Sequence, residues 1–121
     1  MAMADLNASL EDLMGVEGAM CAAIVDYNSG MMLGSVGSGV DMELASAGTT
    51  EVMRAKARTM RMLDLDDRIE DILISLGMQY QIIRPVVSIP GIFIFYVLDA
   101  GRATLALARR KAGEVEQALV L

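Results

Sequence analysis

The sequence has no histidine, no tryptophan and a single cysteine among its 121 residues. Without histidine, the chain cannot use Ser-His or Cys-His nucleophilic catalysis or imidazole metal ligands. With Cys21 alone, it forms no internal disulfide, which suits a reducing compartment. Cys21 also lies in an apolar run, where a buried and unreactive thiol is expected. These absences remove most of the side chains on which catalysis depends.

Aromatic residues are also scarce, at 4% of the chain, whereas hydrophobic residues make up 55% and include 11 methionines. The core is therefore expected to be aliphatic and rich in methionine. The apolar excess either enlarges that core or leaves apolar surface that a partner buries, and both interpretations stay open. No basic stretch precedes an apolar one at the N-terminus, and Ile92–Leu98 is too short to span a bilayer. We expect a cytoplasmic protein that is not inserted in a membrane.

Positive charge is limited and unevenly placed. The net charge is −6, from 16 acidic and 10 basic residues, which argues against a nucleic-acid partner. Three of the basic residues, Arg54, Arg58 and Arg61, are spaced so that they share one face of a helix. A second group lies at Arg102 and Arg109–Lys111. Such segregation indicates either solvated helix faces or a docking face for an acidic protein.

The remaining polar motifs do not predict an active site. The acidic stretch Asp64–Asp71 contains no glycine turn of the kind that gathers oxygen ligands around a hard cation. The glycines of Gly34–Gly39 match no phosphate-binding pattern and predict a flexible connector. Asp26 and Asp99 could form a carboxylate pair, but turn and cap roles explain both. We therefore predict no catalytic, cofactor-binding or metal-binding residue, and a protein that is not an enzyme.

Hydrophobic periodicity places the first half of the secondary structure. Apolar residues at helical spacing predict a helix that Asp5 caps and Gly15 ends. A strand over Ala19–Asp26, apolar on both faces, should turn back at Tyr27–Gly30 into a second strand over Met31–Val36. A long helix then follows, capped by Asp41 and running to about Leu63. One of its faces carries small and apolar residues, namely Leu44, Gly48, Val52, Ala55, Thr59 and Met62.

The second half is predicted to contain three strands and a closing helix. The strands cover about Arg68–Ser75, Gln79–Arg84 and Ile92–Leu98, with Pro85 stopping the middle one. Asp99 is expected to cap the last helix, whose apolar stripe is Leu105, Ala108, Ala112, Val115 and Leu119. The order helix, two strands, helix, three strands, helix predicts a single α+β domain over residues 1–121, built on one antiparallel sheet.

Four stretches of this chain, taken in order, resemble the Roadblock / dynein light-chain family in its bacterial, single-domain form. They are Val16–Ala19, Val25–Gly30, Arg84-Pro85 ahead of Gly91-Ile92-Phe93, and Leu98-Asp99 ahead of Leu105–Arg109. The resemblance implies a five-stranded sheet in the order 2-1-5-4-3. The first and third helices would cover one face and the second helix the other. It also implies dimers in which the third strands pair edge to edge and the second helices lie beside each other.

These observations together predict a dimeric interaction protein. Its dimer interface is expected at Val52, Ala55, Thr59, Met62, Ile69, Ile72 and Ile74, and its docking residues at Arg54, Arg58 and Arg61. The resemblance implies regulation of a small Ras-like GTPase, which bacterial family members of this kind often perform and for which they need not donate a catalytic arginine. The alternatives are a scaffold subunit with no GTPase partner and, less favoured, a small-ligand sensor. A sensor needs convergent polar groups inside an apolar pocket, and the predicted sheet faces have almost none.

Overall fold

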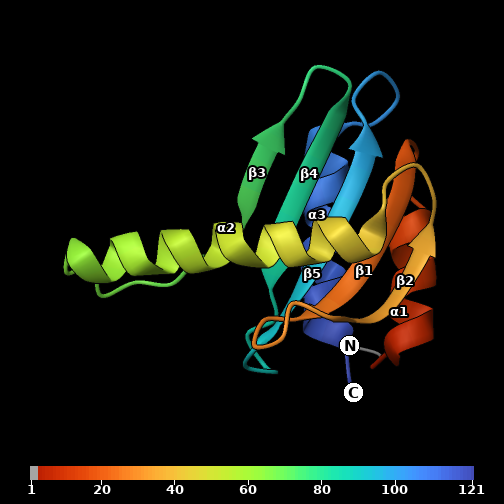
Figure 1. Cartoon of the computed structure of the whole chain (residues 1–121). Helices are drawn as coiled ribbons and strands as arrows, with labels where there is room; N and C mark the ends of the chain where they lie inside the picture. The colour runs from red at the N-terminus through yellow and green to blue at the C-terminus, as the bar shows by residue number, and fades with distance from the viewer. Residues whose placement is uncertain (1–2) are drawn as a thin grey trace.

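A computed structural model, which describes residues 3–121, shows three helices and one five-stranded antiparallel sheet (Figure 1). The elements are α1 (Leu6–Met14), β1 (Ala19–Asp26), β2 (Met32–Gly37), α2 (Met42–Met62), β3 (Ile72–Ser75), β4 (Gln79–Pro85), β5 (Ile92–Asp99) and α3 (Leu105–Ala118). The strands lie in the order β2-β1-β5-β4-β3. The predicted α+β class, element order and strand order are all confirmed.

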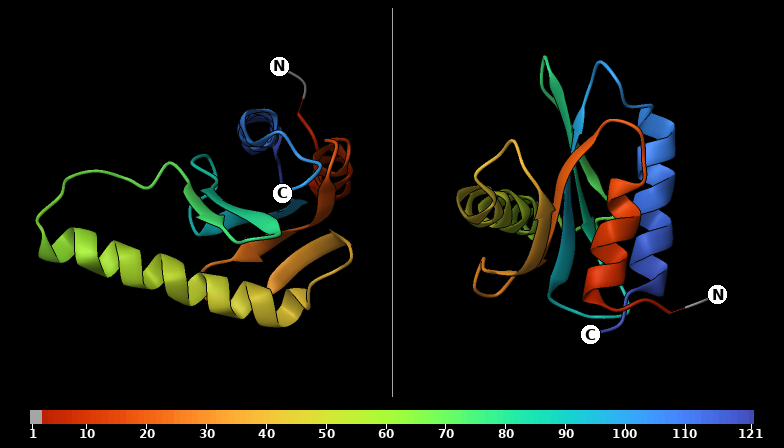
Figure 2. Two further views of the ribbon diagram at one scale, coloured as in Figure 1. Left: turned by 90° about the horizontal axis from the view of Figure 1, so that it is seen from above. Right: turned by 90° about the vertical axis from the view of Figure 1, so that its right-hand side faces the viewer.

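The helices form two layers on opposite sides of the sheet. Helices α1 and α3 lie side by side on one face, and α2 lies alone on the other (Figure 2). None of the helices in the described part of the chain is both long and apolar enough to cross a membrane.

The face covered by α1 and α3 is closed. Leu13 from α1, Ile24 from β1 and Ile94 from β5 are fully buried there. The predicted stripe of α3 is confirmed, since Ala108, Ala112, Val115 and Leu119 are buried on the sheet and Leu105 packs against them. Asp5 caps α1 as predicted, by accepting a hydrogen bond from the backbone N–H of Ala8 at 2.9 Å.

Helix α2 covers only part of the other face. Asp41 caps it as predicted, accepting from the backbone N–H of Leu44 at 3.2 Å. A helix of 21 residues is about 31 Å long, whereas five strands span only about 19 Å from first to last. The helix packs chiefly on β1 and β2, and its C-terminal half projects beyond β3 (Figures 1 and 2). Met53 is buried, but the residues after it leave the sheet.

The third strand is shorter than predicted. It covers Ile72–Ser75 rather than Arg68–Ser75, so Ile69 lies outside it. The reason is that residues 64–71 must return from the projecting end of α2 to the edge of the sheet (Figure 1). The whole acidic stretch Asp64–Asp71 is therefore connection, and none of it belongs to the strand.

The glycine-rich segment after the first hairpin is not a flexible connector throughout. Gly34 and Gly37 both belong to β2, which begins and ends one residue later than the predicted Met31–Val36. Gly37 has a φ of +82°, and a Cβ there would collide with the carbonyl oxygen of Met20. Two features therefore require glycine at this position. The backbone of β1 leaves no room for a side chain, and a side chain would be strained at this positive φ.

Asp99 does not cap the last helix. It ends β5, and its carboxylate accepts a hydrogen bond from the backbone N–H of Gly101 at 2.9 Å. Helix α3 begins later, at Leu105, with Thr104 in the cap position. The corner between them is held by the Asp99 carbonyl, which accepts from the backbone N–H groups of Arg102 and Ala103.

Candidate interface beside helix α2

The predicted dimer residues of α2 form one solvent-facing stripe. Val52, Ala55, Thr59 and Met62 are all exposed, Met62 to 79% of its surface. Leu44, at 72% exposure, continues the stripe toward the start of the helix. The buried side of α2 consists instead of Met42, Ser46, Thr49, Thr50 and Met53. The apolar face recognised in the sequence is therefore the face that the sheet leaves uncovered.

The predicted dimer residues of the third strand divide into two groups. Ile72 and Ile74 are half-buried and pack against the core on the α2 side of the sheet. Ile69 lies instead in the segment that leads to β3. Within residues 3–121, β3 pairs with β4 alone, so its outer edge presents unpaired backbone groups. An exposed edge of this kind can accept another strand.

Arg54 holds α2 to the turn between β1 and β2. Its guanidinium donates to the carbonyl oxygens of Tyr27 and Asn28, each at 3.0 Å, and lies 5.5 Å from the centre of the Tyr27 ring. It also forms an ion pair with Glu51 at 2.6 Å. Arg54 therefore has a structural role that its spacing in the sequence did not indicate.

Arg58 and Arg61 lie on the same side of α2 as Arg54 and are both exposed. In the described part of the chain, neither forms an ion pair, and the same is true of Arg68 in the segment before β3. Lys56, which lies on another side of α2, is likewise exposed and forms no ion pair among residues 3–121, so the positive charge near α2 is not confined to these three arginines.

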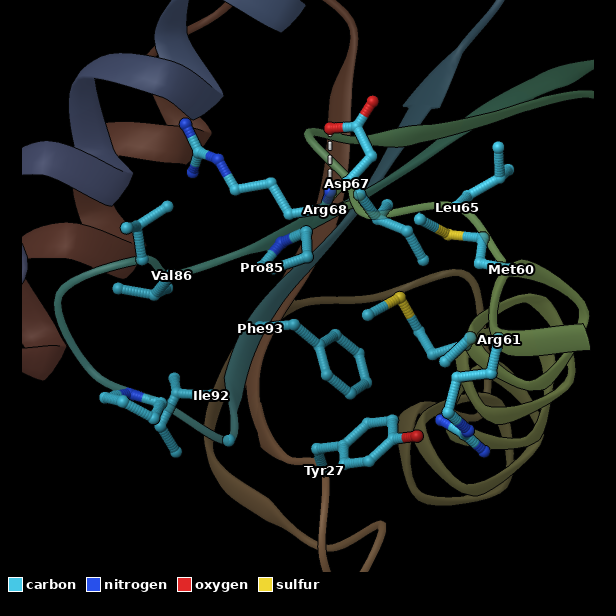
Figure 3. Close-up of a pocket in the computed structure, with 16 residues that line it drawn as sticks. Tyr27, Met60, Arg61, Leu65, Asp67, Arg68, Pro85, Val86, Ile92 and Phe93 are labelled. Atoms are coloured by element: carbon cyan, nitrogen blue, oxygen red, sulfur yellow. Dashed lines mark hydrogen bonds between the residues drawn. The ribbon is translucent and has the colours of Figure 1, made fainter. Parts of the chain in front are cut away.

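A groove of about 550 Å³ opens between α2, the segment before β3 and the loop between β4 and β5 (Figure 3). Its lining is mainly apolar and includes Tyr27, Met53, Ala57, Met60, Leu65 and Phe93. Ile69 also lines it, so this predicted dimer residue faces the groove rather than the edge of β3. Arg61, Asp67 and Arg68 are its charged members. No periodicity in the sequence indicated this groove, because its walls come from four separate segments.

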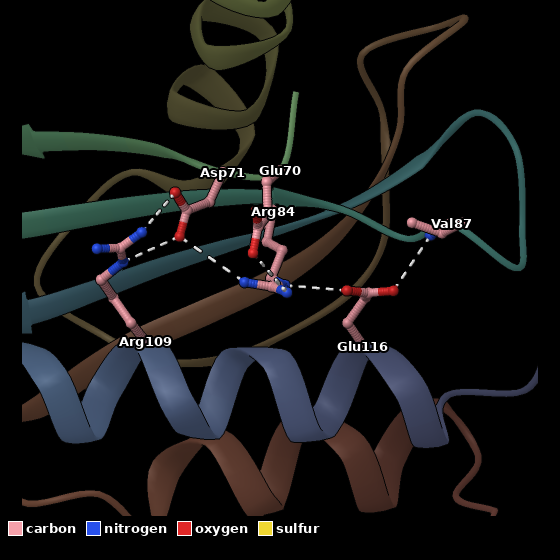
Figure 4. Close-up of polar contacts among 6 residues, drawn as sticks. All are labelled: Glu70, Asp71, Arg84, Val87, Arg109 and Glu116. Carbon is pink, nitrogen blue, oxygen red and sulfur yellow. Dashed lines mark hydrogen bonds and ion pairs between the residues drawn. The ribbon is translucent and has the colours of Figure 1, made fainter. Parts of the chain in front are cut away.

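An ionic network on the opposite face ties the segment before β3 to α3 (Figure 4). Arg84 of β4 lies between Glu116 at 3.0 Å and Asp71 at 3.7 Å, and its side chain is only 15% exposed. Asp71 also binds Arg109 through two bonds of 3.0 Å. Glu116 accepts from the backbone N–H of Val87 at 3.3 Å. No pattern in the sequence indicated this network, since its partners come from separate elements, with Arg84 and Glu116 32 residues apart and Asp71 and Arg109 38 residues apart.

The structure separates the residues considered for catalysis. Asp26 and Asp99 lie at opposite ends of the paired strands β1 and β5, about 20 Å or more apart. Cys21 is fully buried, and burial raises the pKa of its thiol. Over residues 3–121, no three acidic or cysteine side chains converge as metal ligands would. Asp71, counted in the acidic stretch, is instead neutralised by two arginines.

Comparison with known proteins gives a clear result for the fold. No protein-family model and no curated protein sequence matches the chain. Among solved structures, a Roadblock/LC7 domain from Streptomyces avermitilis covers 94% of this chain and 93% of its own, with 10% identity and a TM-score of 0.81. Myxococcus xanthus MglB covers 93% and 89%, with 17% identity and a TM-score of 0.80. An MglB described in a tetrameric arrangement covers 91% and 81%, with 14% identity and a TM-score of 0.80. The chain therefore has the fold of the Roadblock/LC7 domain.

Proposed function

We propose that this protein is a non-enzymatic, homodimeric regulator that docks on a small Ras-like GTPase. The observation that carries the proposal is the uncovered half of α2. A helix that leaves its own sheet while exposing Val52, Ala55 and Met62 has an apolar face that a second protein can bury. The similarity to MglB in a tetrameric arrangement supports self-association.

In the proposed dimer, the β3 edges pair across a two-fold axis. A strand of four residues offers few hydrogen bonds, so the edge alone is too short to hold two chains together. The C-terminal half of α2, which projects beyond β3, would then lie over the partner's sheet and beside the partner's α2. Small residues such as Gly48 and Ala55 permit that close approach.

The docking surface of the dimer is proposed at Arg58 and Arg61. Both arginines are exposed and unpaired within residues 3–121, although the chain as a whole has a net charge of −6. Separated charge of this kind orients an acidic partner during encounter and mainly raises the association rate. Arg54, bound to Tyr27 and Asn28, would keep α2 in position instead of meeting the partner directly.

The dimer is tested by measuring molar mass with light scattering. The wild-type protein should give twice the 13.0 kDa of one chain. Ala55→Arg places a charge in the stripe and should give a monomer that stays folded. Ala106→Arg, at an exposed position of α3, is the matched control and should remain dimeric. A wild-type monomer at high micromolar concentration, or a dimeric Ala55→Arg protein, contradicts the proposed interface.

The docking surface is tested with a small GTPase in each nucleotide state. Arg58→Glu should slow association and flatten its dependence on salt, because charges on an exposed rim act over about 8 Å at physiological ionic strength. Arg102→Glu, an exposed arginine in the corner before α3, should leave both unchanged. A dimer that binds no GTPase in either state would support the scaffold alternative.

A further inference from the structure

The register of β3 determines which backbone groups its free edge presents. Leu76, just after the strand, donates its backbone N–H to the carbonyl oxygen of Gln79 at 2.8 Å, in the same register as the rest of the β3–β4 pair. Hydrogen-bonded positions alternate along an antiparallel strand, so the even-numbered residues of β3 bond to β4. The N–H and C=O groups of Leu73 and Ser75 therefore point outward, and Asp71 occupies the next outward position.

Asp71 continues the register of β3 although the strand begins only at Ile72. The pairing of Ile72 with Ile83 places Asp71 opposite Arg84. The ladder ends there because the next hydrogen-bonding position on β4 is Pro85, which has no N–H to donate. Among residues 3–121, no backbone hydrogen bond joins residues 66–71 to β4. Backbone bonding therefore does not hold Asp71 at the edge of the sheet.

Ion pairs hold Asp71 in place of the missing backbone bonds. Its carboxylate, only 9% exposed, accepts two hydrogen bonds of 3.0 Å from Arg109 of α3 and lies 3.7 Å from the guanidinium of Arg84 (Figure 4). Arg84 is itself fixed by Glu116 at 3.0 Å. The strand position that Pro85 leaves without a backbone partner is thus fastened to β4 and α3 by side chains.

An edge with three outward residues is complementary to a second copy of itself. If a two-fold axis passes beside Leu73, then Leu73 lies opposite Leu73 of the second copy, and Asp71 lies opposite Ser75 in both directions. Each such pair exchanges two hydrogen bonds, so the two edges would form about six. The exposed Leu73 side chains would also cover each other on the α3 side of the sheet. This contact is isologous and closes at two chains.

We propose that Asp71, positioned by Arg84 and Arg109, completes the β3 edge and sets the register in which two copies of this chain pair. The inference rests on the proposed function, because it specifies how the proposed homodimer forms. Without Asp71 in line, a pairing centred on Leu73 keeps only its central pair, whereas a pairing centred on Ile74 offers about four hydrogen bonds. Arg84 and Arg109 are therefore positioning residues of the interface.

Disulfide formation between two copies measures the register. In the proposed pairing, the two Leu73 Cα atoms lie about 5.5 Å apart, which a disulfide can bridge. Leu73→Cys should therefore crosslink in high yield on oxidation. Ile74→Cys should crosslink poorly, because its two copies lie diagonally across the pair. The wild-type protein is the control, since Cys21 is buried. A yield for Ile74→Cys that equals or exceeds that of Leu73→Cys would overturn the proposed register.

Two single substitutions test whether the ion pairs position the edge. Asp71→Asn and Arg109→Gln each remove the pair between these residues, and each should raise the dissociation constant of the dimer by about tenfold. Each should also move the crosslinking preference toward the register centred two residues away. Arg109→Lys keeps the charge and should recover part of the loss. Asp67→Asn in the same segment and Arg110→Gln in α3 are matched controls that should change neither quantity.

Trypsin tests the position of the segment without the dimer. Arg68 is exposed, so cleavage after it reports how firmly residues 66–71 are held. In the Ala55→Arg monomer, Arg109→Gln should accelerate this cleavage severalfold, and Arg110→Gln should not. An unchanged rate would overturn the positioning role.

The inference and the proposed function fail in different ways. A wild-type dimer whose dissociation constant does not respond to Asp71→Asn overturns the inference and leaves the homodimer standing. A wild-type monomer in light scattering overturns the proposed homodimer itself, and the pairing at Leu73 with it.

Discussion

The two faces of the sheet differ in how completely they are covered. On the side of α1 and α3, Leu13, Ile24 and Leu98 have no exposed surface. On the side of α2, burial is complete over β1 and β5, but Ile72 and Ile74 at the β3 edge stay half-exposed. Helices of the same chain thus cover one face of the sheet completely and the other face only in part (Figure 2).

The difference follows from the number of helices and their direction. Two helices of about 10 Å diameter, lying side by side, are as wide as a sheet of about 19 Å. One helix crossing the strands covers a single band and then continues past the edge. Apolar residues outside that band remain in water unless another chain covers them. We therefore expect the partly covered face to bind another chain, and the buried residues of the covered face to contribute more to the stability of the single chain.

Truncation of one apolar residue on each face provides the sharpest test. Leu13→Ala should lower the free energy of unfolding by about 3 kcal/mol, because it opens a cavity in a fully buried site. Leu44→Ala, on the exposed stripe, should change it by less than about 0.5 kcal/mol in the monomer. Urea unfolding measures both. A comparable loss at the two positions would mean that the faces do not differ as described.

The ionic network should contribute the next largest effect. Glu116→Ala leaves the mostly buried guanidinium of Arg84 with a weaker set of partners and should cost about 2–3 kcal/mol of unfolding free energy. Glu114→Ala, in the same helix but half-exposed, should cost less than about 0.5 kcal/mol. Thermal unfolding of the two variants measures both losses. Similar losses of unfolding free energy would contradict a stabilising role of the network.

A substitution at Gly48 should have opposite effects on the stability of the monomer and on the strength of the dimer. Nothing lies within 4 Å of a Cβ at this helical position, so Gly48→Ala should stabilise the monomer by about 0.5–1 kcal/mol. The same methyl group lies on the stripe and should weaken the dimer if the two α2 helices approach closely there. Unfolding of the Ala55→Arg monomer, with and without Gly48→Ala, measures the first effect, and a dilution series measures the second. A stronger dimer would contradict close packing at Gly48.

The smallest expected effect is that of pH near neutrality, since the chain has no histidine. Burial raises the pKa of Cys21 and of Tyr96, and the hydrogen bond with Asp12 raises that of Lys111. A group whose pKa is higher in the folded state stabilises the fold below its unfolded pKa and loses that contribution as pH rises. Stability should therefore decline above pH 9.0, the ordinary pKa of the thiol. Cys21→Ala should move the onset upward, and a rise in stability above this pH would contradict the assignment.

The sequence by itself determined the type and order of the helices and strands and the nature of each helix face. Local signals were sufficient where one residue decides a boundary, as with Asp5 and Asp41 at helix starts and Gly30 in the first turn. Periodicity also identified the apolar stripe of α2 correctly, because the spacing of Val52, Ala55 and Met62 is a property of the helix alone. The resemblance to the Roadblock family supplied the strand order, which the structure confirms.

Tertiary structure alone decided which face of α2 meets the sheet and which residues bind one another. Small and polar residues such as Ser46 and Thr50 are buried there, while the more apolar stripe faces water, a choice that composition does not reveal. Arg54 donates a hydrogen bond to the carbonyl oxygen of Tyr27, and Arg84 forms ion pairs with Asp71 and Glu116. These contacts join segments that are separated in the sequence. The length of β3 and the groove beside α2 depend likewise on where a long helix ends relative to a narrow sheet. Such outcomes depend on packing in three dimensions, which no local pattern encodes.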